Sequence, residues 1–161
     1  MSAGTQKQAS VTTPSEREIR VEREFDAPRD EVFAVMTDPE LIPQWYGWRS
    51  STTRVDYMDA KTGGRWRYVS IDSNGDEYAF QGAYREVTPP ERIVQSWEFE
   101  GMAGHVCIET MELEDLGDRT RMVVTSLFHT TEERDGMLGS MEGGMNETYE
   151  RLDEVLARVA S

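Results

Sequence analysis

The apolar residues near the end of the chain follow the spacing of an amphipathic helix. Steps of three and four residues place seven of them on one face of a helix of about thirty residues, namely Met137, Met141, Met145, Tyr149, Leu152, Leu156 and Val159. The methionine-rich half of this helix also contains Gly136, Gly139, Gly143 and Gly144. A glycine inside a helix costs roughly 0.5–1 kcal/mol relative to alanine. We therefore predict that the second half anchors the helix and that the looser first half covers a cavity.

Upstream of this helix the apolar pattern has a period of two, which is typical of half-buried strands. The first such segment runs from Glu18 to Phe25, and Arg23 interrupts its apolar side, so this arginine needs either water or an acidic partner. Two short helices follow, opened by Asp26-Ala27-Pro28 and by Asp38-Pro39. Alternating segments then fill the middle of the chain, with a hairpin signal at Asn74-Gly75.

The order of these elements predicts an α+β fold. A strand and two short helices are followed by further antiparallel strands, and the long helix, opened by a capping box at Thr130 and Glu133, comes last. A long antiparallel sheet curls, so we expect a curved sheet of about six or seven strands wrapped around the C-terminal helix.

The length of 161 residues favours a single domain. Residues 1–16 are rich in Ser, Thr, Gln and Ala and lack the apolar core of a secretory signal, so we expect a disordered tail followed by one domain over 17–161. No apolar run reaches the length of a membrane span. We expect a cytoplasmic protein that does not insert into membranes.

Charge and ligand counts exclude several classes of function. The net charge of −14 disfavours binding to nucleic acid and to anionic membranes. The single cysteine, Cys107, allows no intramolecular disulfide, and with only His105 and His129 it does not make a standard zinc site. The segment from Asp72 to Glu77 has its glycine at the fourth position, where a calcium loop needs it at the sixth, so we predict a turn. We expect neither a metal nor a cofactor.

A series of short motifs along the chain points to a known family. They are Phe25-Asp26-Ala27-Pro28 with Val32-Phe33, Asp38-Pro39 with Trp45-Tyr46, Gly63-Gly64-Arg65-Trp66-Arg67-Tyr68, Gly82-Ala83-Tyr84-Arg85-Glu86-Val87, Pro90-Glu91-Arg92-Ile93-Val94 with Trp97, and Thr120-Arg121-Met122. In this order they resemble the START-like (SRPBCC, Bet v 1-like) superfamily and, more narrowly, the activator of Hsp90 ATPase homologue-like family. The resemblance covers about residues 17 to 160.

This resemblance implies a helix-grip fold and a choice of functions. Members of such families bind hydrophobic ligands, act as polyketide aromatase/cyclases or stimulate a chaperone ATPase. Relatives commonly carry a Gly-Trp pair in the first half of the final helix, where this chain has Gly143-Gly144-Met145. A pocket of a different shape is therefore expected here.

The candidate site is an apolar ligand cavity between the sheet and the final helix. Strand alternation groups aromatic and methionine side chains on common faces, and the methionines of the helix face them. The expected lining is Trp66, Tyr68, Tyr84, Trp97, Met111, Met122, Val124, Phe128, Met137, Met141 and Met145. The same stripes would also suit an ordinary packed core, and a register error of one residue would exchange the two faces of a strand.

An aromatic cluster follows the second short helix and consists of Trp45, Tyr46 and Trp48. It is expected at the cavity mouth or at a protein interface. The alternative is that Trp45 packs under the edge of the sheet.

Glu109 is the one catalytic candidate. Alternation places it on the same strand face as His105, Cys107 and Met111. A carboxyl in an apolar cavity has a raised pKa and can serve as an acid, a base or a ligand anchor. The alternative is an ion pair with an arginine such as Arg23. A Cys–His nucleophile is not expected, because alternate residues of one strand rarely reach each other.

We therefore expect a protein that binds a small hydrophobic or amphipathic ligand without a catalytic role. One alternative is a cyclase/aromatase-like enzyme that uses the Glu109 carboxylate. The other is a partner of an Hsp90-type chaperone. A homodimer is compatible with a domain of this size.

Overall fold

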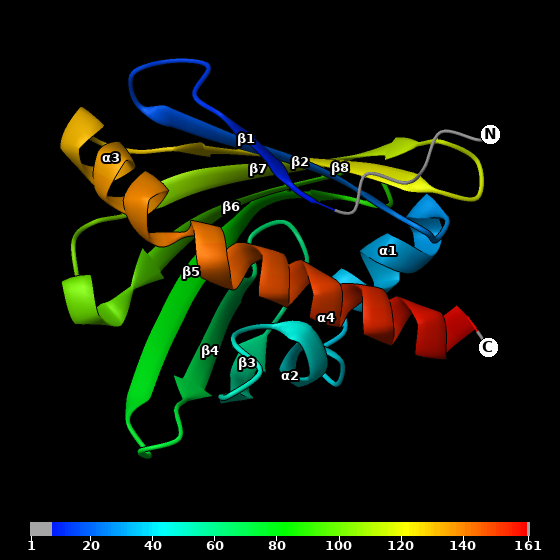
Figure 1. Ribbon diagram of the computed structural model, residues 1–161, viewed down its shortest axis with the longest axis horizontal. Helices are drawn as coiled ribbons and strands as arrows, with labels where there is room; N and C mark the ends of the chain where they lie inside the picture. Colours follow the sequence, from blue (N-terminus) through cyan, green and yellow to red (C-terminus); the bar gives the residue numbers. More distant parts are fainter. Residues whose placement is uncertain (1–7, 161) are drawn as a thin grey trace.

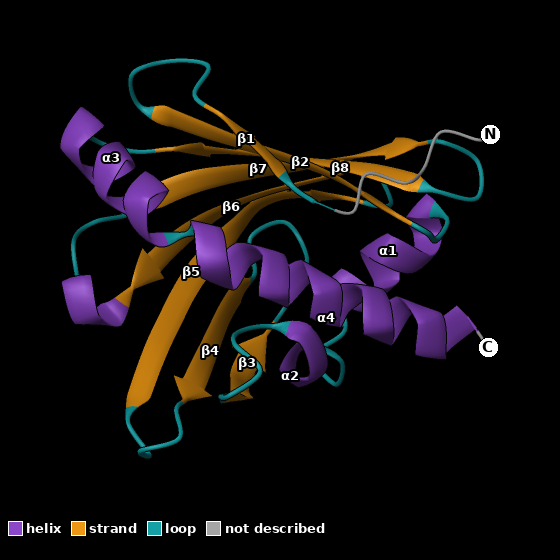
Figure 2. Ribbon diagram, viewed as in Figure 1, coloured by secondary structure: helices purple, strands orange, loops and turns teal. Residues whose placement is uncertain are grey.

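The computed structural model describes residues 8–160 and has the α+β architecture expected from the sequence (Figure 1). A single curved antiparallel sheet of eight strands forms one layer, and helices lie on its concave side (Figure 2). The strands are β1 (Ser10–Thr12), β2 (Glu18–Phe25), β3 (Thr52–Met58), β4 (Arg65–Ile71), β5 (Glu77–Thr88), β6 (Arg92–Phe99), β7 (Cys107–Asp115) and β8 (Thr120–Leu127). The helices are α1 (Arg29–Met36), α2 (Ile42–Trp45), α3 (Thr131–Ser140) and α4 (Glu142–Ala160), with a 3-10 turn at Glu100–Met102.

The strands are ordered β1-β2-β8-β7-β6-β5-β4-β3 across the sheet. From β3 to β8, each strand pairs antiparallel with the next strand in the chain, and β2 pairs antiparallel with β8. The hairpin predicted at Asn74-Gly75 joins β4 to β5, and the Asp72 carboxylate accepts hydrogen bonds from the backbone amides of Asn74 and Asp76 at 2.9 and 3.0 Å. These hydrogen bonds engage the Asp72 carboxylate within the turn.

The expected tail over residues 1–16 needs a correction. Residues 10–12 form β1, which pairs antiparallel with β2 in the register Val11↔Val21. The short strand satisfies backbone groups that β2 would otherwise expose at the edge of the sheet. Residues 1–7 of the expected tail lie outside the described part of the chain.

The single long C-terminal helix predicted from the sequence is wrong in one respect, because α3 and α4 are separate helices. The chain bends at Met141, although the Met141 and Met145 amides still donate to the carbonyls of Met137 and Met141 at 3.1 and 3.0 Å (Figure 1). The break falls within the glycine-rich stretch, where helix propensity is lowest. The predicted capping box is present, since Glu133 N donates to Thr130 Oγ1 at 3.1 Å.

The second half of α4 anchors the helix to the sheet, as its apolar pattern predicts. Leu152, Val155 and Leu156 are buried in the main core. Val159, which was expected on the same face, is 48% exposed, because the apolar face ends one turn earlier. Within residues 8–160, no helix has both the length and the apolar content needed to span a membrane.

Candidate functional site

A pocket of about 620 Å³ lies between the concave face of the sheet and the α3–α4 segment. Most of the residues expected to line a cavity are at this pocket, namely Tyr68, Tyr84, Trp97, Glu109, Met111, Met122, Val124, Phe128, Met137, Met141 and Met145. Trp66 is not among them, because it is fully buried in the main core, where its ring packs against Tyr68 at 4.7 Å between centroids. Apolar and aromatic side chains therefore form most of the pocket wall.

A polar row crosses the sheet at the floor of this pocket. The register aligns Tyr84 with Gln95, Gln95 with Glu109, and Glu109 with Ser126, and these residues all line the pocket. Gln95 Nε2 donates to the Glu109 carboxylate at 3.1 Å. The next row toward the edge of the pocket pairs Trp97 with Cys107, and the row on the other side pairs Ile93 with Met111. The polar row is thus enclosed by apolar rows.

Glu109 is the charged group of this wall, as every other residue at the pocket is apolar, aromatic or uncharged polar in the described part of the chain. Burial raises the pKa of the Glu109 carboxyl, and the hydrogen bond from Gln95 opposes part of that effect. Burial also raises the pKa of the hydroxyls of Tyr46 and Tyr149 and of the Cys107 thiol, and the nearby charge of Glu109 adds to each shift. This carboxyl therefore lies among uncharged hydrogen-bonding groups in an apolar pocket.

Replacing Glu109 by glutamine is expected to stabilise the protein at pH 7.5. The pKa of Glu109 in the folded protein lies above the ordinary value of 4.5, so the stability of the wild type falls as the pH rises through that raised pKa. The amide of glutamine does not ionise, so the stability of the variant has no such dependence on pH. We expect a higher melting temperature for the variant at pH 7.5 and no difference between the two proteins below about pH 4. Glu114→Gln, exposed on the same strand, is the control and should change little. A lower melting temperature for Glu109→Gln at pH 7.5 would contradict this assignment.

The aromatic cluster after α2 forms part of the pocket wall. Trp45 is buried, as the alternative interpretation of the sequence proposed, and it also lines the pocket together with Tyr46 and Trp48. The Tyr46 hydroxyl accepts a hydrogen bond from Trp97 Nε1 at 3.5 Å. Trp48 is 42% exposed and lies against α4, where a Cβ atom on Gly144 would come 2.9 Å from its Nε1. Gly144 thus makes room for the indole of Trp48 at the edge of the pocket.

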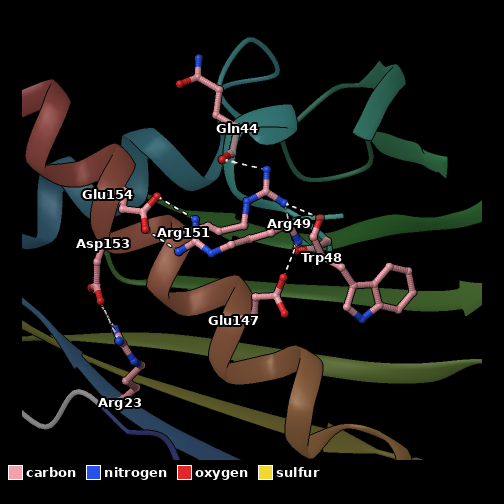
Figure 3. A network of polar contacts seen from close by, with 9 residues as sticks. Arg23, Gln44, Trp48, Arg49, Glu147, Arg151, Asp153 and Glu154 are labelled. Carbon is pink, nitrogen blue, oxygen red and sulfur yellow. Dashed lines mark hydrogen bonds and ion pairs between the residues drawn. The ribbon is translucent and has the colours of Figure 1, made fainter. Parts of the chain in front are cut away.

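One arginine of α4 holds this aromatic loop in place (Figure 3). Arg151 donates hydrogen bonds of 3.0–3.4 Å to the backbone carbonyl oxygens of Pro43, Gln44, Tyr46, Gly47 and Trp48. Carbonyls at the end of a helix such as α2 lack hydrogen-bond partners within the helix. The guanidinium of Arg151 donates the missing hydrogen bonds. Arg49 adds an ion pair with Glu154 and a backbone hydrogen bond to Glu147. The end of α2, which carries Trp45, and the loop that carries Tyr46 and Trp48 are therefore fixed to α4.

Residues 26–157 match the family described as activator of Hsp90 ATPase homolog 1-like proteins. The chain belongs to this family. The activator of Hsp90 ATPase homolog 1-like family includes polyketide cyclase/aromatase-like proteins. Among proteins of curated function, none matches the chain.

Solved structures share this fold over almost the whole chain. A protein from Rhodobacter sphaeroides has a TM-score of 0.88 and 25% identity, and the match covers 94% of this chain and 99% of that one. A protein from Arthrobacter aurescens has a TM-score of 0.83 and 27% identity, with 92% and 91% covered. DynU16, a protein of the dynemicin biosynthetic locus, has a TM-score of 0.65 and 24% identity, and the match covers 89% of this chain but 48% of DynU16.

Several pocket residues of this family member were not predicted from the sequence. They include Tyr78, Phe80, Gln95, Phe99, Ser126 and Tyr149. Gln95 shares a strand face with Trp97, so alternation carried the signal, but Trp97 was the member of that face predicted to line the cavity. Tyr149 was assigned to the anchoring half of the helix, whereas it both contacts Phe25 in the core, at 5.9 Å between ring centroids, and lines the pocket.

His105 does not lie on the strand face that the sequence predicts it to share with Glu109. Strand β7 begins at Cys107, and His105 is an exposed residue that pairs with Glu133 at the start of α3. The two residues line a smaller hollow of about 330 Å³, which shares Trp97, Phe99, Cys107, Phe128, Met137 and Ser140 with the main pocket. Within the described residues, no group of three or more His, Cys, Asp or Glu side chains is placed to hold a metal ion.

Proposed function

We propose that this protein binds a small hydrophobic or amphipathic molecule in the pocket between the sheet and the α3–α4 segment. The observation that carries the proposal is the pocket itself, about 620 Å³ with a mostly apolar wall. Ligand sites usually have volumes of about 300–1,000 Å³ and apolar walls with a few polar groups. Protein interiors are otherwise packed nearly as densely as organic crystals, so a hollow of this size is more typical of a ligand site than of a core.

The wall supports such binding energetically. Burial of apolar ligand surface contributes about 25 cal/mol per Å² before the costs of association. Met137, Met141 and Met145 lie along the helical side, and flexible thioether side chains adapt to ligands of different shape. Glu109 and Gln95 supply the polar contacts that orient an amphipathic molecule. Membership of the family is consistent with an interaction with a small molecule or with a chaperone.

A neutral fluorescent probe tests the proposal. N-phenyl-1-naphthylamine should bind the purified protein saturably with an increase in fluorescence, and 1-octanol should displace it. Replacing Met141 by tryptophan puts a bulky ring at the bend between the two helices, where Met141 lines the pocket, and should weaken binding at least tenfold. Binding of both compounds without saturation, or no binding, would contradict the proposal.

The matched control for this variant is Ala157→Trp. Ala157 is exposed on α4 and is not part of the pocket wall, so the same indole there should leave the affinity within about twofold of wild type. Equal affinity of the Met141→Trp variant and the control would place the probe outside the pocket.

A second candidate function is a cyclase/aromatase-like activity. It is favoured by the Glu109 carboxyl, because a carboxyl with a pKa raised by burial in a pocket is a typical general acid or base. The family includes polyketide cyclase/aromatase-like proteins. Wild-type turnover of a linear precursor of an aromatic polyketide would support this activity if Glu109→Gln abolished the turnover and left the affinity for the probe unchanged. Equal turnover by the variant would exclude Glu109 from it.

A further inference from the structure

The charge of the pocket wall is one-sided. Glu109 is the one charged residue at the pocket, and no Lys, Arg or His is among the described residues that line it. The buried Arg23 lies outside this wall, 5.9 Å from the centroid of the Tyr149 ring, and its charge forms a two-pronged ion pair with Asp153 at 2.9 and 2.7 Å. An anionic ligand would therefore meet a carboxylate without a compensating cation, which is unfavourable in an apolar site.

The carboxylate of Glu109 retains acceptor capacity toward the pocket. A carboxylate has two oxygens and about four lone-pair sites, and the side-chain hydrogen bond that it accepts comes from the amide of Gln95. An amide donor satisfies part of that capacity and carries no positive charge. The site is thus built to accept a further donor, and a cation is the donor that gains most from a buried carboxylate.

Aromatic rings line the same pocket as this carboxylate. Tyr46, Tyr68 and Tyr149 are part of the pocket wall with Glu109, and the rings of Tyr46 and Tyr68 lie 5.0 Å apart between centroids. Further rings at the pocket belong to Trp45, Trp48, Tyr78, Phe80, Tyr84 and Trp97. Ring faces attract cations within about 6 Å, and several rings around one acid form the kind of cage that holds ammonium groups.

From this arrangement we propose that the pocket selects a hydrophobic cation, an amine or a quaternary ammonium with an apolar body, whose positive charge lies against Glu109 among the tyrosine rings. The inference rests on the proposed function and names its ligand class. The net charge of −14 supports it from outside, because an acidic surface concentrates cations near the protein and repels anions.

Three probes of equal chain length test this selectivity. Octyltrimethylammonium, 1-octanol and octanoate differ in charge at one end, and their affinities are measured by displacement of N-phenyl-1-naphthylamine and by calorimetry at pH 7.5. We expect the cation to bind at least tenfold more tightly than the alcohol, and octanoate to bind more weakly than the alcohol. Equal affinity of the cation and the alcohol, or tighter binding of octanoate, would overturn the inference and leave the proposed function standing.

A charge-neutral variant assigns the selectivity to one residue. Glu109→Gln should lose at least tenfold in affinity for octyltrimethylammonium, so that the variant binds the cation no more tightly than 1-octanol. Glu114→Gln, exposed on the same strand, makes the same change in net charge and should keep the preference for the cation. A preference retained by Glu109→Gln would overturn the inference, whereas failure of all three probes to bind wild type would overturn the proposed function together with it.

Discussion

Replacing Asp153 by alanine is expected to lower the free energy of unfolding by about 3–5 kcal/mol. Asp153 lies on α4 and forms its ion pair with Arg23, whose side chain is 1% exposed (Figure 3). The guanidinium also lies over the ring of Phe25, at 4.7 Å from its centroid. Without the carboxylate, the buried guanidinium loses this ion pair and cannot reach water. Urea denaturation at pH 7 measures the loss.

Two further variants separate burial from charge. Glu154→Ala removes the carboxylate of an exposed ion pair with Arg49 one residue along the same helix, and exposed pairs contribute less than about 1 kcal/mol. In the Asp153→Ala background, Arg23→Met removes the buried cation and should recover most of the lost stability. A double variant as unstable as Asp153→Ala alone would show that the loss comes from packing rather than from the buried charge of Arg23.

The strand face on which a residue lies could be predicted from the sequence. Arg23 interrupts an apolar strand face and was expected to find either water or an acidic partner, and it found Asp153, which is 130 residues away. The side of β7 that carries Glu109 followed from alternation with Met111 and Leu113. The alternative that Arg23 pairs with Glu109 did not identify its acid, because alternation gives a direction and says nothing about which partner lies there.

Features that depend on contacts between distant segments could not be predicted. Arg151 looks like a surface residue of an amphipathic helix, yet it organises the loop around Tyr46 through backbone carbonyls, which have no sequence signature. Trp66 shares a face with Tyr68, but it packs in the core while Tyr68 lines the pocket. The bend at Met141 requires both low helix propensity and a curved sheet to follow. Local pattern therefore predicts the fold well and the outline of the pocket less completely.

The family explains the scaffold and leaves the chemistry of the site to particular residues. Burial raises the pKa of Glu109, because an ionised carboxyl loses hydration in the pocket, so this residue makes the fold less stable as the pH rises. Polar groups that destabilise a core are typical of functional sites. A residue that lowers stability and confers ligand selectivity belongs to a ligand site. The stability of the Glu109→Gln variant and its ligand affinities therefore both test whether Glu109 is such a residue.

Replacing Gly82 by alanine is the second large effect that we expect. Gly82 lies in β5 opposite Trp66, and a Cβ atom there would come 1.9 Å from the carbonyl oxygen of Ser96 in β6 and 2.7 Å from Trp66 Nε1. The first clash is with backbone, which cannot move aside as a flexible side chain can. We expect a loss of about 3 kcal/mol, at the upper end of the cost of overpacking, measured by urea denaturation.

The matched control, Gly139→Ala, should have the opposite sign. Gly139 lies in α3 with open space around its Cβ position, so alanine there should stabilise the helix by about 0.5–1 kcal/mol. A Gly82→Ala variant as stable as wild type would mean that β5 and β6 can separate. Because Tyr84 and Gln95 face the pocket just beyond this contact, such a separation should lower the affinity for N-phenyl-1-naphthylamine. The close approach of β5 and β6 at Gly82 therefore helps to determine the shape of the pocket.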